Sequence, residues 1–286
     1  MIDEAELRRH VGRKTRQEDV VTAFPVQALI ATLGRDERAP AEGEPIPTGW
    51  HSLYFHATPR REAMTADGVI ADGGLFPSLP EFPRRMFAGQ SIKFRGDIRV
   101  GDRLVRESEL IDIALKRGGT GAMIFVTARN RIHGPQGLCL EEEYSGVLRE
   151  PAAPGAGNTA PRREAAPEDC PWQQTVELDV VTLFRFSALT FNAHRIHYDR
   201  VWATEVEGYP GLVVHGPLSL NLLLNFARDH MPGRRLSRFA MRARAPLFDT
   251  APFSLVGRPG EDGQTAEVWA VTPEGTVAMS AAVDFA

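Results

Sequence analysis

Residues 191–199 hold the side chains best suited to chemistry in this chain. Within eight positions they bring together an amide, two imidazoles and a carboxylate, supplied by Asn192, His194, His197 and Asp199. An imidazole exchanges protons near neutral pH, and amide or backbone N–H groups can polarise a carbonyl oxygen. The stretch therefore predicts transfer of a proton beside a polarised carbonyl, without a metal or a cofactor.

A long helix is predicted shortly after this stretch, from about Pro217 to His230. Proline is favoured at the first helical position, where its missing N–H costs nothing, and Pro232-Gly233 provides a stop signal. Leucine and phenylalanine cover nearly every face of the segment, which is typical of a buried helix. We expect an antiparallel sheet to wrap this helix. The first half has no comparable element, and residues 18–33 are its nearest candidate.

Strand patterns repeat in the two halves of the chain. In each half an arginine pair is followed by a strand, a kinked strand, a further strand, a Gly/Pro turn and a last strand, which indicates a duplicated unit. Coincidence is the alternative, since the halves share little identity. The expected strands are residues 91–94, 98–102, 123–128 and 138–147, then 239–242, 246–249, 265–271 and 276–285.

A segment rich in proline, alanine and glycine, residues 151–168, separates the halves. It has no large apolar residue and no periodicity, so we expect an exposed, semi-extended linker. The predicted organisation is an N-terminal unit over residues 1–150, the linker, and a C-terminal unit over residues 169–286.

Composition narrows the class of protein. A 43% hydrophobic and 24% charged content is that of a soluble globular chain, and a net charge of −4 gives no reason to expect a nucleic-acid partner. Cys139 and Cys170 are too few for a disulfide framework, and a buried free Cys139 is expected. The acidic start lacks a signal-peptide core and no apolar run could span a bilayer, so we expect a cytoplasmic protein without membrane contact.

The motif in residues 182–217 resembles the hydratase motif of the MaoC-like (R-hydratase, or hydratase 2) branch of hot-dog proteins. Ala188-Leu189-Thr190-Phe191-Asn192-Ala193-His194-Arg195-Ile196-His197 fills its first part, and Val213-Val214-His215-Gly216 its second. Residues 50–55, 83–89 and 125–129 are similar to the subgroup of mesaconyl-C4-CoA (3-methylfumaryl-CoA) and itaconyl-CoA hydratases. The resemblance covers most of the chain. It implies an α+β, double hot-dog fold, with two antiparallel sheets that each wrap a helix and lie side by side.

The chain departs from the family pattern at two places. Asn192 stands where the family usually has a catalytic aspartate, and His194-Arg195 replaces the usual Asn-Pro pair. The subgroup shares this change, so it need not abolish activity. It does remove the carboxylate that would share the proton transfer with His197.

The resemblance implies three catalytic residues, each with a structural alternative. His197 would transfer the proton at the C2–C3 bond of a thioester, or else be a packed histidine. Asn192 would orient water through its amide, or else only end a helix. The backbone N–H of Gly216 would bind the developing enolate oxygen at a helix N-terminus, or else glycine is needed there for its backbone angles.

Substrate-binding roles are expected for Arg84, Arg85, His194, His215 and Arg242. Arginine pairs well with carboxylates and phosphates, so Arg84-Arg85 could bind a substrate carboxylate. The series Arg234, Arg235, Arg238, Arg242 and Arg244 could meet the phosphates of coenzyme A; solvated surface arginines are the alternative in both cases. His215 could instead fix the turn, and Asp199 could cap a helix. No metal is expected from His194, His197 and His215, because no cysteine or HExxH spacing accompanies them.

The predicted function is a hydro-lyase that adds water to a short, branched, dicarboxylic enoyl-CoA. No cofactor is expected, because coenzyme A is part of the substrate. Three alternatives are a 3-hydroxyacyl-thioester dehydratase of fatty acid or polyketide synthesis, a non-catalytic acyl-CoA-binding module, and a thioesterase on the same fold. The expected partner is a small acyl-CoA thioester, and the expected assembly is a monomer or homodimer, because two units in one chain can complete a site.

Overall fold

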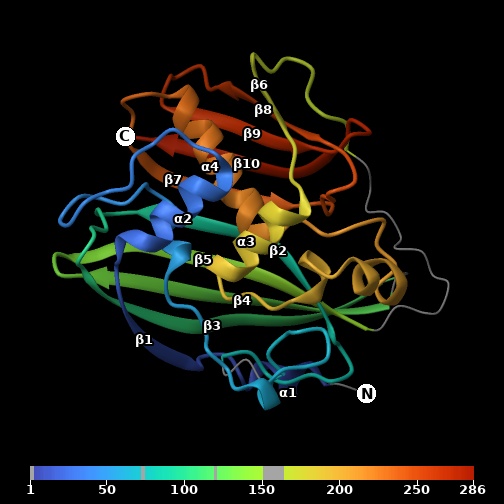
Figure 1. Ribbon diagram of the computed structural model, residues 1–286. Helices are drawn as coiled ribbons and strands as arrows, with labels where there is room; N and C mark the ends of the chain where they lie inside the picture. The colour runs from blue at the N-terminus through green and yellow to red at the C-terminus, as the bar shows by residue number, and fades with distance from the viewer. Residues whose placement is uncertain (1–2, 72–74, 119–120, 151–163) are drawn as a thin grey trace.

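The structure is a computed structural model that describes residues 3–71, 75–118, 121–150 and 164–286. Its dominant feature is one antiparallel sheet with helices packed on one of its faces (Figure 1). The first half of the chain forms α1 (Glu4–Arg8), β1 (Lys14–Val20), α2 (Ala23–Leu33), η1 (Trp50–Leu53), η2 (Arg61–Ala63), β2 (Arg84–Phe94), β3 (Arg103–Gly118), β4 (Gly121–Gly134) and β5 (Gly137–Arg149).

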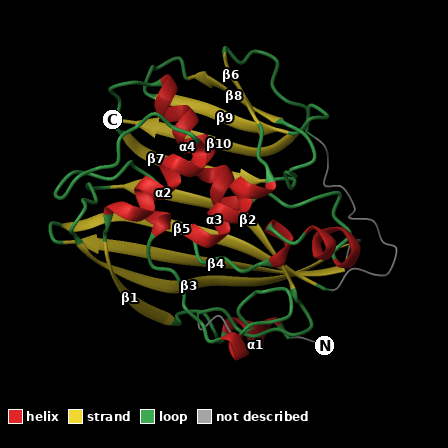
Figure 2. Cartoon of the chain, in the orientation of Figure 1, coloured by secondary structure: helices red, strands yellow, loops and turns green. Residues whose placement is uncertain are grey.

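The second half repeats this plan, with a longer helical segment (Figure 2). It forms β6 (Trp172–Val176), α3 (Val180–Leu189), η3 (Arg195–His197), η4 (Trp202–Val206), α4 (Gly216–His230), β7 (Leu236–Ala243), β8 (Phe253–Pro259), β9 (Thr265–Val271) and β10 (Val277–Phe285). The element η4 is a short π-helical turn.

The order of the strands shows how the two halves are related. The sheet runs β1-β3-β4-β5-β2-β7-β10-β9-β8-β6, so each half contributes five strands in the same internal order. The halves join through antiparallel pairing of β2 with β7, from Gly89 opposite Arg242 to Lys93 opposite Arg238. Two similar sheets therefore lie side by side as one continuous sheet, as the expected α+β, double hot-dog architecture requires.

Helix α4 is buried as the sequence predicts, and it begins one residue earlier than expected, at Gly216. The side chains of Leu218 and Leu223 are fully buried, and that of Phe226 is 1% exposed. The first half reaches this helix through η1, where Trp50 Nε1 donates to Asn225 Oδ1 at 3.0 Å. The core around α4 is therefore shared by both halves.

Most of the predicted strands are present. Residues 91–94 lie in β2, 123–128 in β4, 138–147 in β5, 239–242 in β7, 265–271 form β9, and all but the first of residues 276–285 form β10. Strands β1, β3, β6 and β8 were not predicted.

Both of the predicted kinked strands are wrong. Residues 98–102 and 246–249 each form only an isolated bridge, Arg99 with Pro45 and Phe248 with Val213. Residues 98–102 form a turn instead of a strand. The turn contains Gly101, whose φ is +95°, and the Asp102 side chain accepts from the Arg99 N–H at 2.8 Å. Residues 18–33 are also not one helix, because their first residues belong to β1 and α2 begins at Ala23.

A buried polar network lies in the sheet of the first half. Glu142 on β5 is 6% exposed, and its carboxylate contacts His51 Nε2 at 2.9 Å, Gln90 Nε2 at 2.6 Å and Asn130 Nδ2 at 2.7 Å. Burial alone would raise the pKa of Glu142, but the nearby His51 and the hydrogen bonds lower it to about 2. The carboxylate is therefore ionised inside the fold.

Other sequence expectations have mixed outcomes. Cys139 and Cys170 are both free and buried, as expected for Cys139.

Residues 151–163 of the predicted linker lie outside the described residues. Residues 164–166 run beside the β9–β10 turn, where the Val277 N–H donates to Glu164 O at 2.8 Å. No helix in the described part of the chain is long and apolar enough to cross a membrane.

Candidate active site

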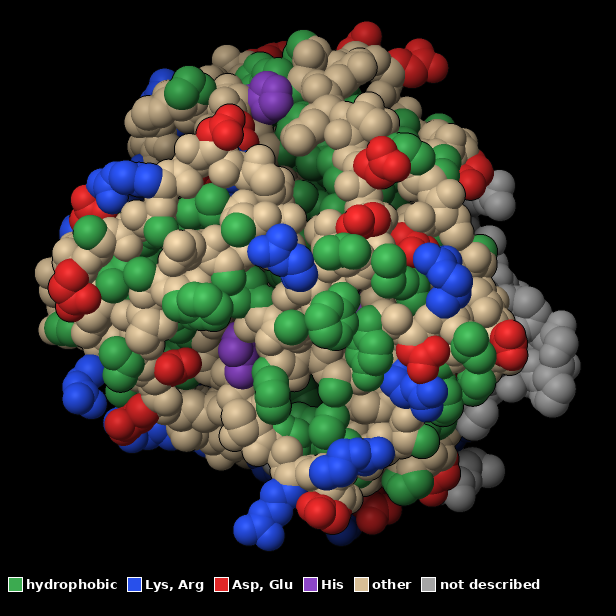
Figure 3. Space-filling model, in the orientation of Figure 1, with side chains coloured by type: hydrophobic (Ala, Val, Ile, Leu, Met, Phe, Trp, Pro, Cys, Tyr) green, Lys and Arg blue, Asp and Glu red, His purple; other side chains and the backbone are tan. Residues whose placement is uncertain are grey.

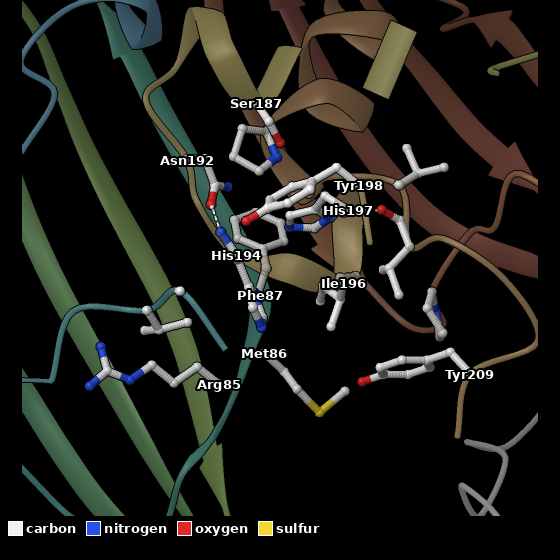
Figure 4. A pocket seen from close by; sticks show the side chains of 18 of the residues that line it. Arg85, Met86, Phe87, Ser187, Asn192, His194, Ile196, His197, Tyr198 and Tyr209 are labelled. Carbon is white, nitrogen blue, oxygen red and sulfur yellow. Dashed lines mark hydrogen bonds between the residues drawn. The ribbon is translucent and has the colours of Figure 1, made fainter. Parts of the chain in front are cut away.

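A large cleft lies where the two halves meet. Its volume is about 1670 Å³, and it is lined by the loop after α3 and the start of α4 from one half and by β2 and residues 57–70 from the other. Figure 4 shows Asn192, His194 and His197 close together, with Phe87, Met86 and Arg85 approaching from β2. The cleft is therefore lined by all three predicted catalytic residues, Asn192, His197 and Gly216.

Part of the surface around the cleft is apolar. Hydrophobic side chains gather over α3 and the turns that follow it (Figure 3), and Phe184 and Phe191 are 57% and 62% exposed. Both of these phenylalanines also line the cleft. An entering ligand would therefore meet two exposed phenylalanine rings.

Local hydrogen bonds fix the loop that carries the polar groups. Helix α3 is capped by Asp179, and the chain then turns at Phe191, whose φ is +50°. The Asp199 side chain caps the next helical turn through the Trp202 N–H at 3.0 Å and pairs with Arg195 at 2.7 Å. Asp199 thus has the capping role that the sequence offered as an alternative.

His197 is held with one ring nitrogen facing the protein. Its Nδ1 lies 2.7 Å from the carbonyl oxygen of Val213, which can only accept, so Nδ1 carries the proton and Nε2 is left as a base. The residue lines the cleft and is 7% exposed. Burial lowers the pKa of His197 to about 3, the carbonyl of Val213 opposes this effect, and His194 adds to it. The imidazole is therefore neutral at neutral pH, with Nε2 unprotonated.

The position of His215 does not fit the substrate-binding role expected for it. The side chain is fully buried and is not among the residues that line the cleft. Its ring stacks on that of His197 with centroids 3.8 Å apart, and its Nε2 lies 2.8 Å from Ser187 Oγ. Burial, and then the neighbouring His197 and His194, lower the pKa of His215 to about 2. His215 therefore packs against the His197 ring inside the protein, because the side chain of this residue, which precedes α4, points into the core.

Asn192 lines the cleft, and the oxygen of its side-chain amide already accepts a hydrogen bond within the protein. Its Oδ1 accepts from the His194 backbone N–H at 3.0 Å, the dashed contact of Figure 4. That contact leaves the NH₂ group as the donor available to a ligand. The asparagine both ends the turn after α3 and presents a donor, so its two sequence interpretations are compatible.

Changing Asn192 should have a moderate effect. Asn192→Ala is expected to lower the hydration rate about 2- to 13-fold, the worth of one neutral hydrogen bond of about 0.5–1.5 kcal/mol. Asn192→Asp retains an acceptor for the His194 N–H and places a negative charge near His197. It should raise the pKa of His197 and move the low-pH limb of activity to higher pH. A profile identical to that of the wild type would contradict this charge effect.

Gly216 is required by close packing rather than by its backbone angles. It lines the cleft as the first residue of α4, and it is not among the glycines with positive φ. A Cβ at this position would come within 3.0 Å of the Phe87 ring on β2. The N–H groups of a first helical turn have no partner within the helix, and the helix dipole favours an anion there. The backbone at Gly216 can therefore donate to a developing oxyanion.

The predicted arginines divide between the cleft and other surfaces. Arg85 lines the cleft and is exposed at its rim, whereas its neighbour Arg84 does not line it. Arg242 also lies outside the cleft, so its substrate-binding role is not supported; two residues along, Arg244 lines it and pairs with Glu164 at 2.9 Å. Arg84 and Arg85 are successive residues of β2, and successive side chains point to opposite faces of a sheet. Arg244 lies one residue beyond the end of β7.

Other residues of the cleft were missed by the sequence analysis. They include Arg61, Arg149 and Tyr144 from the first half and Tyr209 from the second. None of the first-half residues belongs to a recognisable motif, and they reach the cleft only because β2 and β7 pair. Among the described residues, no group of three or more His, Cys, Asp or Glu side chains has an arrangement that could hold a metal ion.

Comparisons with known proteins place the chain in a family. The model of the family "Hydroxyacyl-thioester dehydratase type 2" matches residues 49–249. The mesaconyl-C(4)-CoA hydratase of Chloroflexus aurantiacus is 43% identical over 96% of this chain and 96% of its own length.

Solved structures give the same fold at low identity. A MaoC-like dehydratase from Phytophthora capsici has a TM-score of 0.71 and 12% identity, covering 100% of this chain and 99% of that one. A Mycobacterium tuberculosis protein described as a double hot-dog has a TM-score of 0.59 and 14% identity, covering 96% of each chain. The fold and family predictions are confirmed: this chain belongs to the hydroxyacyl-thioester dehydratase type 2 family and has the double hot-dog fold.

Proposed function

We propose that this chain is a hydratase that adds water to a short dicarboxylic enoyl-CoA, such as mesaconyl-C4-CoA or itaconyl-CoA. The observation that carries the proposal is the orientation of His197, whose Nδ1 is bound to Val213 O so that Nε2 can act as a base. The backbone of Gly216 lines the same cleft. The similarity to a mesaconyl-C(4)-CoA hydratase supports this choice of substrate.

The reaction uses groups of the protein alone. The Gly216 N–H donates to the carbonyl oxygen of the thioester and stabilises negative charge there. A water oxygen attacks C3 while His197 Nε2 accepts one of its protons, and the electron pair of the double bond moves toward the thioester. Protonation of C2 completes the addition of water, and the reverse sequence is dehydration. Coenzyme A enters as part of the substrate, and no further cofactor takes part.

One chain supplies both sides of the cleft, so a monomer suffices for this chemistry. Residues of β2 and the segment 57–70 form one wall, and the loop after α3 and the start of α4 form the other. A homodimer would then add stability rather than catalytic groups. Light scattering on dilute, active protein measures which state carries the activity.

Arg85 is the residue that we assign to the second carboxylate of the substrate. It lines the cleft on the strand that also carries Phe87, which packs against Gly216. A carboxylate a few atoms from the double bond needs a partner once the ligand has excluded water. The planar guanidinium stays charged and can bind both carboxylate oxygens.

The test compares mesaconyl-C4-CoA with crotonyl-CoA, which lacks the second carboxylate. Arg85→Ala is expected to lower kcat/KM for mesaconyl-C4-CoA by about 1.5–3 kcal/mol, or about 13- to 160-fold, the worth of hydrogen bonds to a charged group. Its effect on crotonyl-CoA should be small. Arg84→Ala is the matched control, because Arg84 neighbours Arg85 in the sequence but does not line the cleft.

Two results would contradict the proposal. Equal losses on both substrates would assign Arg85 to coenzyme A binding or to folding. A wild-type protein that hydrates crotonyl-CoA or longer enoyl-CoA thioesters but not the dicarboxylate would exclude the dicarboxylic substrate.

The exposed phenylalanines at the cleft favour a second function, the dehydration of 3-hydroxyacyl thioesters. Phe184 and Phe191 line the cleft and are largely exposed, which suits an aliphatic acyl chain, so dehydration of 3-hydroxyacyl thioesters is the alternative. Assays with 3-hydroxyacyl-CoA and 3-hydroxyacyl-acyl-carrier-protein substrates of increasing chain length decide between the two. Release of free thiol in the same assays would indicate a thioesterase, and binding without turnover a non-catalytic module.

A further inference from the structure

A carboxylate from the first half of the chain approaches the histidines of the cleft. Asp67 lies in a tight hairpin closed by the Met64–Ile70 bridge and by the Thr65 N–H, which donates to Val69 O at 2.8 Å. Gly68 follows it with a φ of +84°. The hairpin belongs to the segment that forms one wall of the cleft.

This hairpin is docked on the loop that carries the polar groups. The Arg195 N–H donates to Asp67 O at 2.8 Å, and the Arg195 guanidinium donates to Ala66 O at 3.3 Å. A Cβ on Gly68 would lie only 1.8 Å from the carbonyl oxygen of Ala193, so no other residue fits there without a shift of the backbone. The position of Asp67 relative to the loop is therefore fixed by main-chain contacts.

The two oxygens of Asp67 have different surroundings. Oδ1 accepts from the Thr65 hydroxyl and, at 3.4 Å, from the Val69 N–H. Oδ2 lies 3.8 Å from His194 Nε2, and the side chains of Asp67 and His194 are only 21% and 18% exposed. The carboxylate is thus oriented by its own hairpin so that one oxygen faces His194.

His194 connects this carboxylate to the catalytic centre. It lines the cleft, and its ring lies edge-on to that of His197 with centroids 5.4 Å apart (Figure 4). The charged or titratable groups that act on it are Asp67, Arg85 and His197. Burial lowers the pKa of His194, the Asp67 carboxylate opposes this effect, and Arg85 adds to it.

We infer that His194 is the second proton-transfer group of the hydration, and that Asp67 from the first half is the positioning residue that stabilises its protonated form. The inference rests on the proposed function. It explains how the site works although Asn192 cannot exchange a proton.

The step balances with two imidazoles. His197 Nε2 accepts a proton from water as the C3–O bond forms, and the electron pair of the double bond moves through C2 to the thioester oxygen at Gly216. Protonated His194 then releases its proton to C2 as the enolate collapses. His197 loses its proton to solvent and His194 regains one, so both groups return to their starting states and one water has been added.

Asp67→Asn tests the inference through the pH dependence of kcat. If protonated His194 is required, activity falls as pH rises through its pKa, and loss of the carboxylate lowers that pKa. The basic limb of the profile should therefore move to lower pH by about one unit or more, the usual effect of a nearby opposite charge. Arg85→Ala should move it to higher pH, and His194→Gln should lower kcat about 10²–10⁴-fold.

The control is Glu62→Gln, which removes an exposed carboxylate of η2 that does not line the cleft and should leave the profile unchanged. The NMR titration of His194 in wild type and Asp67→Asn measures the same pKa change without any substrate. If the wild type is active but the basic limb of the Asp67→Asn profile lies at the same pH as that of the wild type, the inference is wrong. A rate loss in Asp67→Asn that is equal at every pH contradicts it as well. Neither result contradicts the proposed function. A wild type that turns over no enoyl-CoA overturns the proposed function, and the titration then still decides whether Asp67 controls His194.

Discussion

Replacing His197 by alanine is expected to lower the hydration rate about 10²–10⁴-fold, the usual contribution of a positioned acid–base group. The expectation follows from geometry: Val213 O binds Nδ1, so Nε2 is a free base, and His197 and the start of α4 line one cleft. The measurement is the loss of the conjugated absorbance of the enoyl thioester, with circular dichroism to show that the variant is folded.

His197→Asn separates proton transfer from packing. Its amide can still donate to Val213 O, but it cannot accept a proton, so it should be nearly as inactive as the alanine variant. Since the pKa of His197 is about 3, wild-type activity should be lost through protonation of this residue only near pH 3. A folded His197→Ala protein with nearly wild-type turnover would mean that another group is the base.

The polar residues that line the cleft together could be predicted because they lie in one stretch of the sequence. Asn192, His194 and His197 share a single loop, and Gly216 begins the helix that follows it. Local hydrogen bonds determine that geometry, so the residue types and their spacing were informative. The role of His215 could not be predicted, since only packing shows that its ring lies behind His197 rather than in the cleft.

The contribution of the first half could not be predicted in the same way. Asp67 and Phe87 are close to the loop after α3 only because β2 pairs with β7 and the 64–70 hairpin docks on residues 193–195. Asp67 lies in no pattern with a chemical meaning of its own, and the resemblance of residues 83–89 to the subgroup assigned no role to Phe87. Strand alternation alone could have separated Arg84 from Arg85, but it does not say which of the two faces the ligand.

The fold was predicted best where apolar residues dominate. Helix α4 and strand β9 stand out by their runs of leucine, valine and alanine. Strand β3 is sixteen residues long, yet nearly half of its side chains are charged, and it was missed. Residues 98–102 have β-branched residues but form a turn, because the hydrogen bond from the Arg99 N–H to the Asp102 side chain outweighs their local strand propensity.

Glu142 is where a stability measurement should show the largest effect. Glu142→Ala is expected to destabilise the fold by about 3–5 kcal/mol, because removing one partner of a buried charged network leaves the others unpaired. The partners are His51, Gln90 and Asn130, which all contact the carboxylate. The free energy of unfolding in urea, measured with the same slope for both proteins, gives the difference.

The neighbouring glutamates on β5 supply the control. Glu143 points to the other face and pairs with Arg129 at 2.7 Å with a side chain 43% exposed, so Glu143→Ala should cost only about 0–1 kcal/mol.

The pH dependence of stability is a second check on Glu142. Its pKa falls from 4.5 in the unfolded chain to about 2 in the fold, so its contribution is complete above about pH 4.5 and is lost as pH falls toward 2. Glu142→Gln lacks this contribution, so the stability gap between it and the wild type should narrow over that interval. A gap that stays constant from pH 5 to pH 2 would show that the native network does not lower the pKa of Glu142.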